Sequence, residues 1–232
     1  MPEHDVVLAS GEHRLTATVV SAGAGPAPGV LLVHGLGSDR GTNVERARAL
    51  TATHGHTCMA VDLAGHGAST GRLSQVTPRQ NLADVAAAYD ALLDRRDVEP
   101  SRVGVCAASY GAYLAVLLTE QRPVSRLLLR APALYRDDSL DRPLAARRAG
   151  DPTTATRVLG TFAAVPGPVL VVESEHDEVV PPQTVAAYLA ARPGTAHRVL
   201  PGAAHALTDP AWRAAFTEVL LAFFAPLSAA PA

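Results

Sequence analysis

The stretch Arg102-Val-Gly-Val-Cys-Ala-Ala-Ser109-Tyr-Gly-Ala-Tyr-Leu-Ala-Val-Leu-Leu118 indicates the fold of this chain. Residues 102–106 are apolar enough for a buried strand, and residues 112–118 suit a buried helix. Ser109 lies in the sharp turn between them, in a pentad close to Gly-x-Ser-x-Gly, with Ala107 in place of the first glycine. Such a turn projects the hydroxyl above the sheet, at a helix N-terminus that favours negative charge. Ser109 is therefore a candidate nucleophile.

Composition limits the classes of protein that need considering. The chain has 232 residues, 48% of them hydrophobic, which fits one α/β domain over residues 1–232 and excludes disorder. A net charge of −2, with all 20 basic residues arginine, leaves no basic stripe for nucleic acid. Met1–Asp5 lacks a signal-peptide pattern, and no apolar run approaches the roughly 20 residues that span a bilayer. We expect a cytoplasmic protein with no membrane partner.

Apolar strands and amphipathic helices alternate after an N-terminal hairpin that turns at Ser10-Gly11-Glu12. This alternation predicts a mostly parallel sheet with helices on both faces. The predicted strands are 30–33, 57–63, 102–107, 125–130, 168–173 and 196–200. The predicted helices cover 44–54 and begin at Pro78, with Thr77 as N-cap, and at Pro210.

Residues 132–166 interrupt the alternation. The segment is rich in Arg and Asp, and we expect short helices at Leu140–Ala149 and near Thr154–Phe162. It is too long for an ordinary connection. We interpret it as a small lid over the site; a surface excursion without a role in binding is the alternative.

A glycine-containing loop, Val33-His-Gly-Leu-Gly37, follows the first parallel strand. It could direct the backbone N–H of Leu36 toward an anionic oxygen, together with the N–H of Tyr110. The alternative is a glycine turn selected only for tightness. The loop after the next strand, which contains Asp62 and His66, is interpreted as structural.

The apolar strand that ends near Glu173 is followed by several acids. A carboxylate partner for a catalytic histidine should lie just past this strand, at the same sheet edge as Ser109. Asp177 has the best position, with Glu173 and Glu175 as alternatives. His176 is interpreted as a loop residue rather than a base.

His205 follows the last predicted strand. Asp177 lies 177 − 109 = 68 residues after Ser109, and His205 lies 205 − 177 = 28 residues after Asp177. The second interval leaves room for one strand–helix unit between the acid and the base. His197 is a poorer candidate, because it would lie at the opposite sheet edge. We therefore predict a catalytic triad of Ser109, Asp177 and His205.

These motifs together resemble the α/β-hydrolase superfamily over nearly the whole chain. They are His34-Gly35, Asp62-x-x-Gly-His-Gly-x-Ser69, Ala-x-Ser109-x-Gly, Asp177-x-x-Val-Pro181 and Gly-x-x-His205. The chain looks most similar to small bacterial esterases of the serine-aminopeptidase-like and dienelactone-hydrolase-like branches. Dienelactone hydrolases use a cysteine nucleophile, so their substrate is not carried over to Ser109.

The resemblance implies an eight-stranded sheet in the order 1-2-4-3-5-6-7-8, with its second strand antiparallel. In that order a strand separates Cys58 from Cys106, about 9–10 Å apart and beyond disulfide reach, so both are expected to be core thiols.

The expected activity is hydrolysis of a small carboxylic ester through an acyl-enzyme on Ser109, with Leu36 and Tyr110 N–H groups as the oxyanion hole and with no metal or cofactor required. Thioesterase, amidase or peptidase activity uses the same groups. A non-hydrolytic enzyme of this fold and a binding protein are the remaining alternatives, and the oligomeric state is left open.

Overall fold

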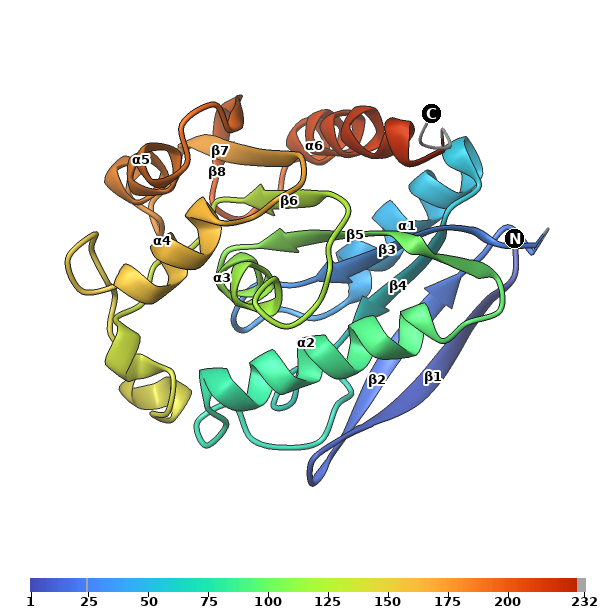
Figure 1. Cartoon of the computed structure of the whole chain (residues 1–232), viewed down its shortest axis with the longest axis horizontal. Helices are drawn as coiled ribbons and strands as arrows, with labels where there is room; N and C mark the ends of the chain where they lie inside the picture. The colour runs from blue at the N-terminus through green and yellow to red at the C-terminus, as the bar shows by residue number, and fades with distance from the viewer. Residues whose placement is uncertain (24, 229–232) are drawn as a thin grey trace.

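An eight-stranded sheet runs through the middle of the molecule (Figure 1). The computed structural model describes residues 1–23 and 25–228. The strands are β1 Glu3–Ser10, β2 His13–Val20, β3 Ala27–Val33, β4 Thr57–Val61, β5 Val98–Ala108, β6 Leu127–Arg130, β7 Val169–His176 and β8 Ala196–Ala204. Their order is β1-β2-β4-β3-β5-β6-β7-β8, and β2 pairs antiparallel with both of its neighbours. The predicted sheet order is therefore confirmed.

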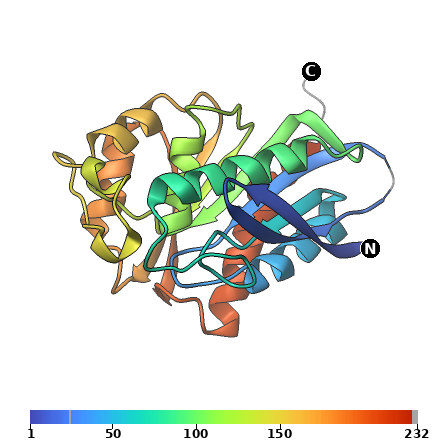
Figure 2. The same cartoon turned by 90° about the horizontal axis from the view of Figure 1, so that it is seen from below.

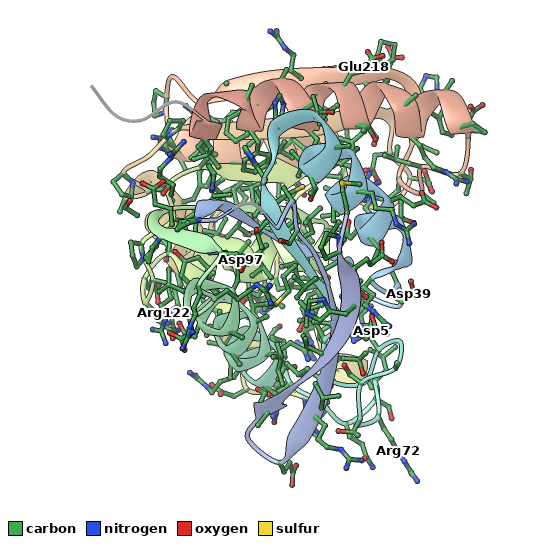
Figure 3. The ribbon with its side chains drawn as sticks, turned by 90° about the vertical axis from the view of Figure 1, so that its right-hand side faces the viewer. Asp5, Asp39, Arg72, Asp97, Arg122 and Glu218 are labelled. Carbon is green, nitrogen blue, oxygen red and sulfur yellow. The ribbon has the colours of Figure 1, made fainter. Side chains whose placement is uncertain are left out.

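Helices cover both faces of the sheet, as the alternating pattern predicts (Figures 1 and 2). The helices are α1 Gly41–His54, α2 Pro78–Leu93, α3 Tyr110–Leu118, α4 Thr156–Ala163, α5 Pro182–Ala191 and α6 Pro210–Phe224. One apolar cluster joins the sheet to α1 and α6, and a second, larger one joins it to α2, α3, α4 and α5. Figure 3 shows α1 and α6 on one side of the sheet and α2 on the other.

The side chains of β3 show why this strand lies at the centre. Leu31 and Val33 belong to the cluster under α2 and α3, whereas Val30 and Leu32 belong to the cluster under α1 and α6. Because successive strand residues point to opposite faces, a strand covered on both sides must be apolar throughout.

Cys58 and Cys106 lie on β4 and β5, with β3 between them. Both side chains are buried, and burial raises the pKa of each thiol to about 12. They are core thiols, as expected.

Several helix ends follow local sequence signals. Thr77 caps α2 by accepting a hydrogen bond from the Gln80 N–H at 3.1 Å, and proline occupies the first position of α2 and of α6. At the end of α1, Gly55 adopts φ 72°, a left-handed conformation that suits glycine.

The predicted helix at Leu140–Ala149 is wrong. The chain forms two short 3₁₀ turns, Asp137–Ser139 and Leu144–Ala146, and Ala149 then pairs with Tyr135 in an isolated bridge. Pro143 explains the difference, because it lacks an N–H donor and disfavours helical geometry at the residue before it. The predicted helix near Thr154–Phe162 is confirmed as α4, shifted by one or two residues.

The segment 132–166 contributes to the hydrophobic core. Leu140, Leu144, Val158 and Phe162 are buried in the cluster that also contains α2 and α3. The segment therefore buries more apolar surface than its many charged residues suggest.

No helix in residues 1–23 and 25–228 combines the length and the apolar character needed to cross a membrane.

Candidate active site

The turn between β5 and α3 holds Ser109 in a strained conformation. Ser109 has φ 52° and ψ −116°, a region that non-glycine residues rarely adopt. Its backbone N–H donates to the Arg130 carbonyl at 2.8 Å, and its own carbonyl accepts from the Ala133 N–H at 3.1 Å. These bonds tie the turn to the end of β6 and stabilise its geometry.

Glycine at position 111 allows the turn to lie against the neighbouring loop. A Cβ atom at Gly111 would lie 2.4 Å from the carbonyl oxygen of His34, closer than real Cβ contacts allow. On the other side, a Cβ at Gly35 would lie 3.3 Å from the Cβ of Ser109. The two glycines bring the loop after β3 into direct contact with Ser109.

His34 orients this loop. Its Nε2 accepts from the Leu63 N–H at 3.1 Å, so Nδ1 carries the proton and donates to the Gly35 carbonyl at 2.7 Å. Burial lowers the pKa of His34 to about 4, which keeps the ring neutral. In a trans peptide the C=O and the following N–H point in opposite directions, so this bond directs the Leu36 N–H away from His34.

The N–H groups of Leu36 and Tyr110 are both available to a ligand. Within residues 1–23 and 25–228, neither N–H donates a hydrogen bond to a protein acceptor. Tyr110 is the first residue of α3, where the helix leaves its N–H groups unpaired. The use of these two N–H groups as an oxyanion hole stays a prediction.

Asp177 and His205 meet because of the pairing of β7 with β8. His176 and Ala204 are partners in this parallel pair, so the next residue of each strand extends from the same sheet edge. The Nδ1 of His205 lies 2.9 and 2.8 Å from Oδ1 and Oδ2 of Asp177. This contact holds Nδ1 as the protonated nitrogen and leaves Nε2 as an acceptor.

Local hydrogen bonds stabilise the ionised form of Asp177. Burial opposes ionisation, but bonds from His205 and from the backbone N–H groups of Val180 and Val179 outweigh it and lower the pKa of the carboxyl. Glu178 accepts from the backbone N–H of His205 at 3.1 Å and fixes the start of that loop.

The alternative acids have other partners. Glu173 Oε2 lies 2.9 Å from Nε2 of His197, and Glu175 accepts from the Gly202 N–H at 2.6 Å. His176 is exposed. Of the acids considered from the sequence, only Asp177 has its side chain hydrogen-bonded to the imidazole of His205.

Ser109 and His205 line one cavity of about 390 Å³. Its walls come from the loop after β3, the start of α1, the end of β6, the loop after β8 and the start of α6. No residue of 132–166 is among the described residues that line it, so the lid interpretation of this segment stays a prediction.

The loop around Asp62 is held by buried hydrogen bonds. Asp62 accepts from the backbone N–H groups of Arg40 at 2.7 Å and Ala68 at 2.8 Å, and pairs with the Arg40 guanidinium. His66 is buried and bonds to the Ala64 carbonyl. These contacts agree with a structural role for both residues.

The sequence did not predict two buried arginines on the cavity wall. They are Arg46 on α1 and Arg130 at the end of β6. Arg130 could have been found from the sequence, because it ends an otherwise apolar strand, Leu127–Arg130. The helix pattern contained no signal for Arg46. In the part of the chain that the structure describes, no group of three His, Cys, Asp or Glu side chains could hold a metal ion.

Comparison with known proteins identifies a family. Residues 25–163 match the model of a hydrolase family described as serine aminopeptidase, S33. An uncharacterized protein of Mycobacterium tuberculosis is 35% identical over 196 residues, which are 82% of this chain. The chain spans 66% of the length of that relative.

Solved structures share the fold at low sequence identity. The protein Est1E of Butyrivibrio proteoclasticus, solved with ferulic acid, aligns with a TM-score of 0.76 at 19% identity and covers 94% of this chain and 97% of its own. A dienelactone hydrolase of Anabaena variabilis aligns with a TM-score of 0.71 at 22% identity over 96% of both chains. A thioesterase domain from the curacin biosynthetic pathway aligns with a TM-score of 0.74 at 15% identity, covering 95% of this chain and 100% of its own.

Proposed function

Because the chain belongs to the serine aminopeptidase S33 family of hydrolases with the α/β-hydrolase fold, we propose that it cleaves small carboxylic esters through an acyl-enzyme on Ser109. The observation that carries this proposal is the hydrogen bond from Asp177 to His205, because His205 lines the same cavity as Ser109. Membership of the family does not say which chemical bond the protein cleaves. A serine, a histidine and an aspartate in this arrangement suit acyl transfer.

The proposal assigns one role to each of these groups. The Oγ of Ser109 attacks the acyl carbon while Nε2 of His205 takes the hydroxyl proton, and the carbonyl electron pair moves to its oxygen. The N–H groups of Leu36 and Tyr110 donate to that oxyanion. When the carbonyl reforms, the alcohol leaves with the proton from His205. Water, deprotonated by His205, then attacks the acyl-enzyme and releases the acid and Ser109.

Asp177 and His34 act through other groups. Asp177 holds the His205 tautomer and stabilises the imidazolium that forms during attack. His34 holds the peptide that carries the Leu36 N–H, and we assign it a positioning role. In this proposal neither Asp177 nor His34 forms a covalent bond with the substrate.

Labelling by a fluorophosphonate tests the nucleophile. We expect one equivalent to attach at Ser109 and to abolish hydrolysis of 4-nitrophenyl acetate. Ser109→Ala should lose labelling and about a million-fold in turnover, whereas Ser101→Ala, at the opposite end of β5, should retain both. Labelling of Ser109 without turnover of any ester would overturn the ester assignment, and a panel of thioesters and aminoacyl amides would then identify the bond.

A further inference from the structure

The cavity beside Ser109 is positively charged, because its walls hold more arginine than acidic side chains. The charged groups on its walls are Arg46 from α1, Arg130 from β6, Arg213 from α6 and Asp39 from the loop before α1, beside the imidazoles of His34 and His205. Asp39 and Arg213 are exposed, whereas only 9% of Arg46 and 7% of Arg130 are exposed. The buried part of the cavity therefore contains two cations.

Neither buried arginine forms a direct ion pair, although the charge of Asp177 acts on Arg130 from a distance and partly opposes the lowering of its pKa by burial. None of the ion pairs among the described residues includes Arg46, Arg130 or Arg213. Elsewhere, partly buried arginines do pair, as Arg40 pairs with Asp62. A buried charge without an ionic partner is costly to the folded protein, so an arginine is seldom kept there unless a ligand pairs with it.

The protein satisfies these two guanidinium groups only in part. Arg130 donates to the His205 carbonyl at 2.8 Å and to the Ser174 hydroxyl at 3.4 Å, while its buried Nε has no acceptor in the described structure. Arg46 donates to Asn43 Oδ1 at 2.8 Å and lies 4.8 Å above the Phe216 ring. The Nη2 group of Arg130 and the Nε and Nη2 groups of Arg46 donate no hydrogen bond within the described residues, so these donors remain for a ligand.

Both side chains are held in place for recognition. Arg46 is stacked on an aromatic ring, and Arg130 is bonded to the backbone of the loop that carries His205. Burial lowers the pKa of Arg130 to about 10, which leaves it charged at neutral pH. A guanidinium fork of fixed orientation matches the two oxygens of a carboxylate.

We propose that this cavity binds a carboxylate carried by the substrate, so that the preferred substrates are esters with a second, ionised carboxyl group. This inference rests on the proposed ester hydrolysis at Ser109. The anion would pair with Arg46 and Arg130 while the scissile carbonyl lies at Ser109. Arg213, at the rim, would add attraction during entry, and Asp39 would oppose it.

Matched esters test the preference. We expect the 4-nitrophenyl hemiesters of glutarate and adipate to be hydrolysed with kcat/KM about ten- to a hundredfold above their neutral isosteres, in which an isopropyl group replaces the carboxylate. The advantage should shrink as ionic strength rises. Equal or better turnover of the neutral esters would overturn the carboxylate site and leave the proposed function intact.

Variants locate the effect. Arg46→Met should lower kcat/KM for the charged esters at least tenfold and change it for the neutral esters by less than about threefold. Arg48→Met is the matched control, because Arg48 lies on the same helix but pairs with Glu3 away from the cavity. If both variants behave alike, Arg46 does not bind the carboxylate.

Binding can be measured without turnover. Glutarate should bind Ser109→Ala protein by calorimetry, and Arg46→Met in that background should weaken binding at least tenfold. Absence of binding would contradict the site even if esters are hydrolysed. Binding without any ester hydrolysis in the parent enzyme would instead contradict the proposed function.

Discussion

At the scale of single residues, the candidate site depends on two histidines whose ring nitrogens have defined hydrogen-bond partners. His205 bonds to Asp177 and His34 bonds to Gly35, and each bond selects the ring nitrogen that keeps its proton. In the first case the tautomer leaves Nε2 as an acceptor, which we propose takes the Ser109 proton. In the second it turns a peptide group so that an N–H is available. The two ring orientations thus serve two different parts of the reaction that we propose.

Replacing the acid tests its identity. Asp177→Asn should lower kcat about 10⁴-fold, because an amide favours the wrong tautomer of His205. Glu173→Gln and Glu175→Gln should lower it less than about tenfold, since both carboxylates bond elsewhere. Steady-state kinetics on one activated ester checks all three. A larger loss for Glu173→Gln would show that the acid lies on β7 itself.

At the scale of elements, the site depends on how closely the β5–α3 turn approaches the loop after β3. The contact is between backbones, because Gly111 and Gly35 have no side chains there. The strain at Ser109 is maintained by hydrogen bonds to β6 and to the chain just beyond it. The geometry of Ser109 is therefore a property of three neighbouring elements.

Gly111→Ala should disturb this contact. The added methyl group would overlap the His34 carbonyl, and we expect a loss of about 1–3 kcal/mol of unfolding free energy together with lower activity. Gly160→Ala on α4 is the control, because its Cβ would meet no atom within 4 Å and alanine favours helix. Urea denaturation compares the two. Equal stability of both variants would contradict the close approach.

The segment 132–166 is expected to support the core. Replacing residues 137–164 by a short Gly/Ser loop would remove Leu140, Leu144, Val158 and Phe162 from the cluster beside α2 and α3. We expect the unfolding free energy to fall by more than about 3 kcal/mol, since each buried large side chain contributes about 2–5. An unchanged denaturation midpoint would show that the segment is a surface excursion.

At the scale of the whole molecule, the cavity beside Ser109 and the segment 132–166 are associated with opposite faces of the sheet. The cavity beside Ser109 lies toward α1 and α6, whereas the segment 132–166 packs with the helices of the opposite face. The substrate binding that we propose for this cavity would therefore take place on the α1–α6 side. The charge of that side comes from arginines on three different elements.

Stability should decrease in mild acid. Burial lowers the pKa of His34 from 6.5 to about 4, so the unfolded chain binds more protons between these values and the unfolding free energy rises with pH there. The contribution is complete above about pH 6.5 and is lost by about pH 4, a change on the order of 3 kcal/mol. The lowered pKa values of His56 and His66 act in the same direction, again with burial as the main cause. Denaturation curves from pH 4 to 7 measure the slope.

His34→Gln separates the contribution of His34 from those of the other buried histidines. Glutamine keeps a donor for Gly35 and an acceptor for Leu63 but does not titrate, so the slope between pH 4 and 6.5 should become shallower. An identical slope in both proteins would show that His34 is protonated as readily in the folded chain as in the unfolded one.

The amino-acid sequence alone determined the fold and the positions of the candidate site residues. Alternating strand and helix patterns predict the layers, and Ser109, Asp177 and His205 each follow a strand whose end is visible in the pattern. Parallel strands place their carboxyl ends at one edge, so the sequence order predicts that these residues lie at the same edge of the sheet. Pro143 is also visible in the sequence, and its missing N–H disfavours the predicted helix over residues 140–149.

Only the tertiary structure decided which groups face one another. The pairing of Asp177 with His205, the burial of the 132–166 leucines and the convergence of Arg46 and Arg130 depend on strand register and helix packing, which join residues far apart in the chain. Periodicity reports which face of an element is apolar, but it does not report which neighbour covers that face. For this reason the charge of the cavity, and with it the proposed carboxylate preference, became apparent only in three dimensions.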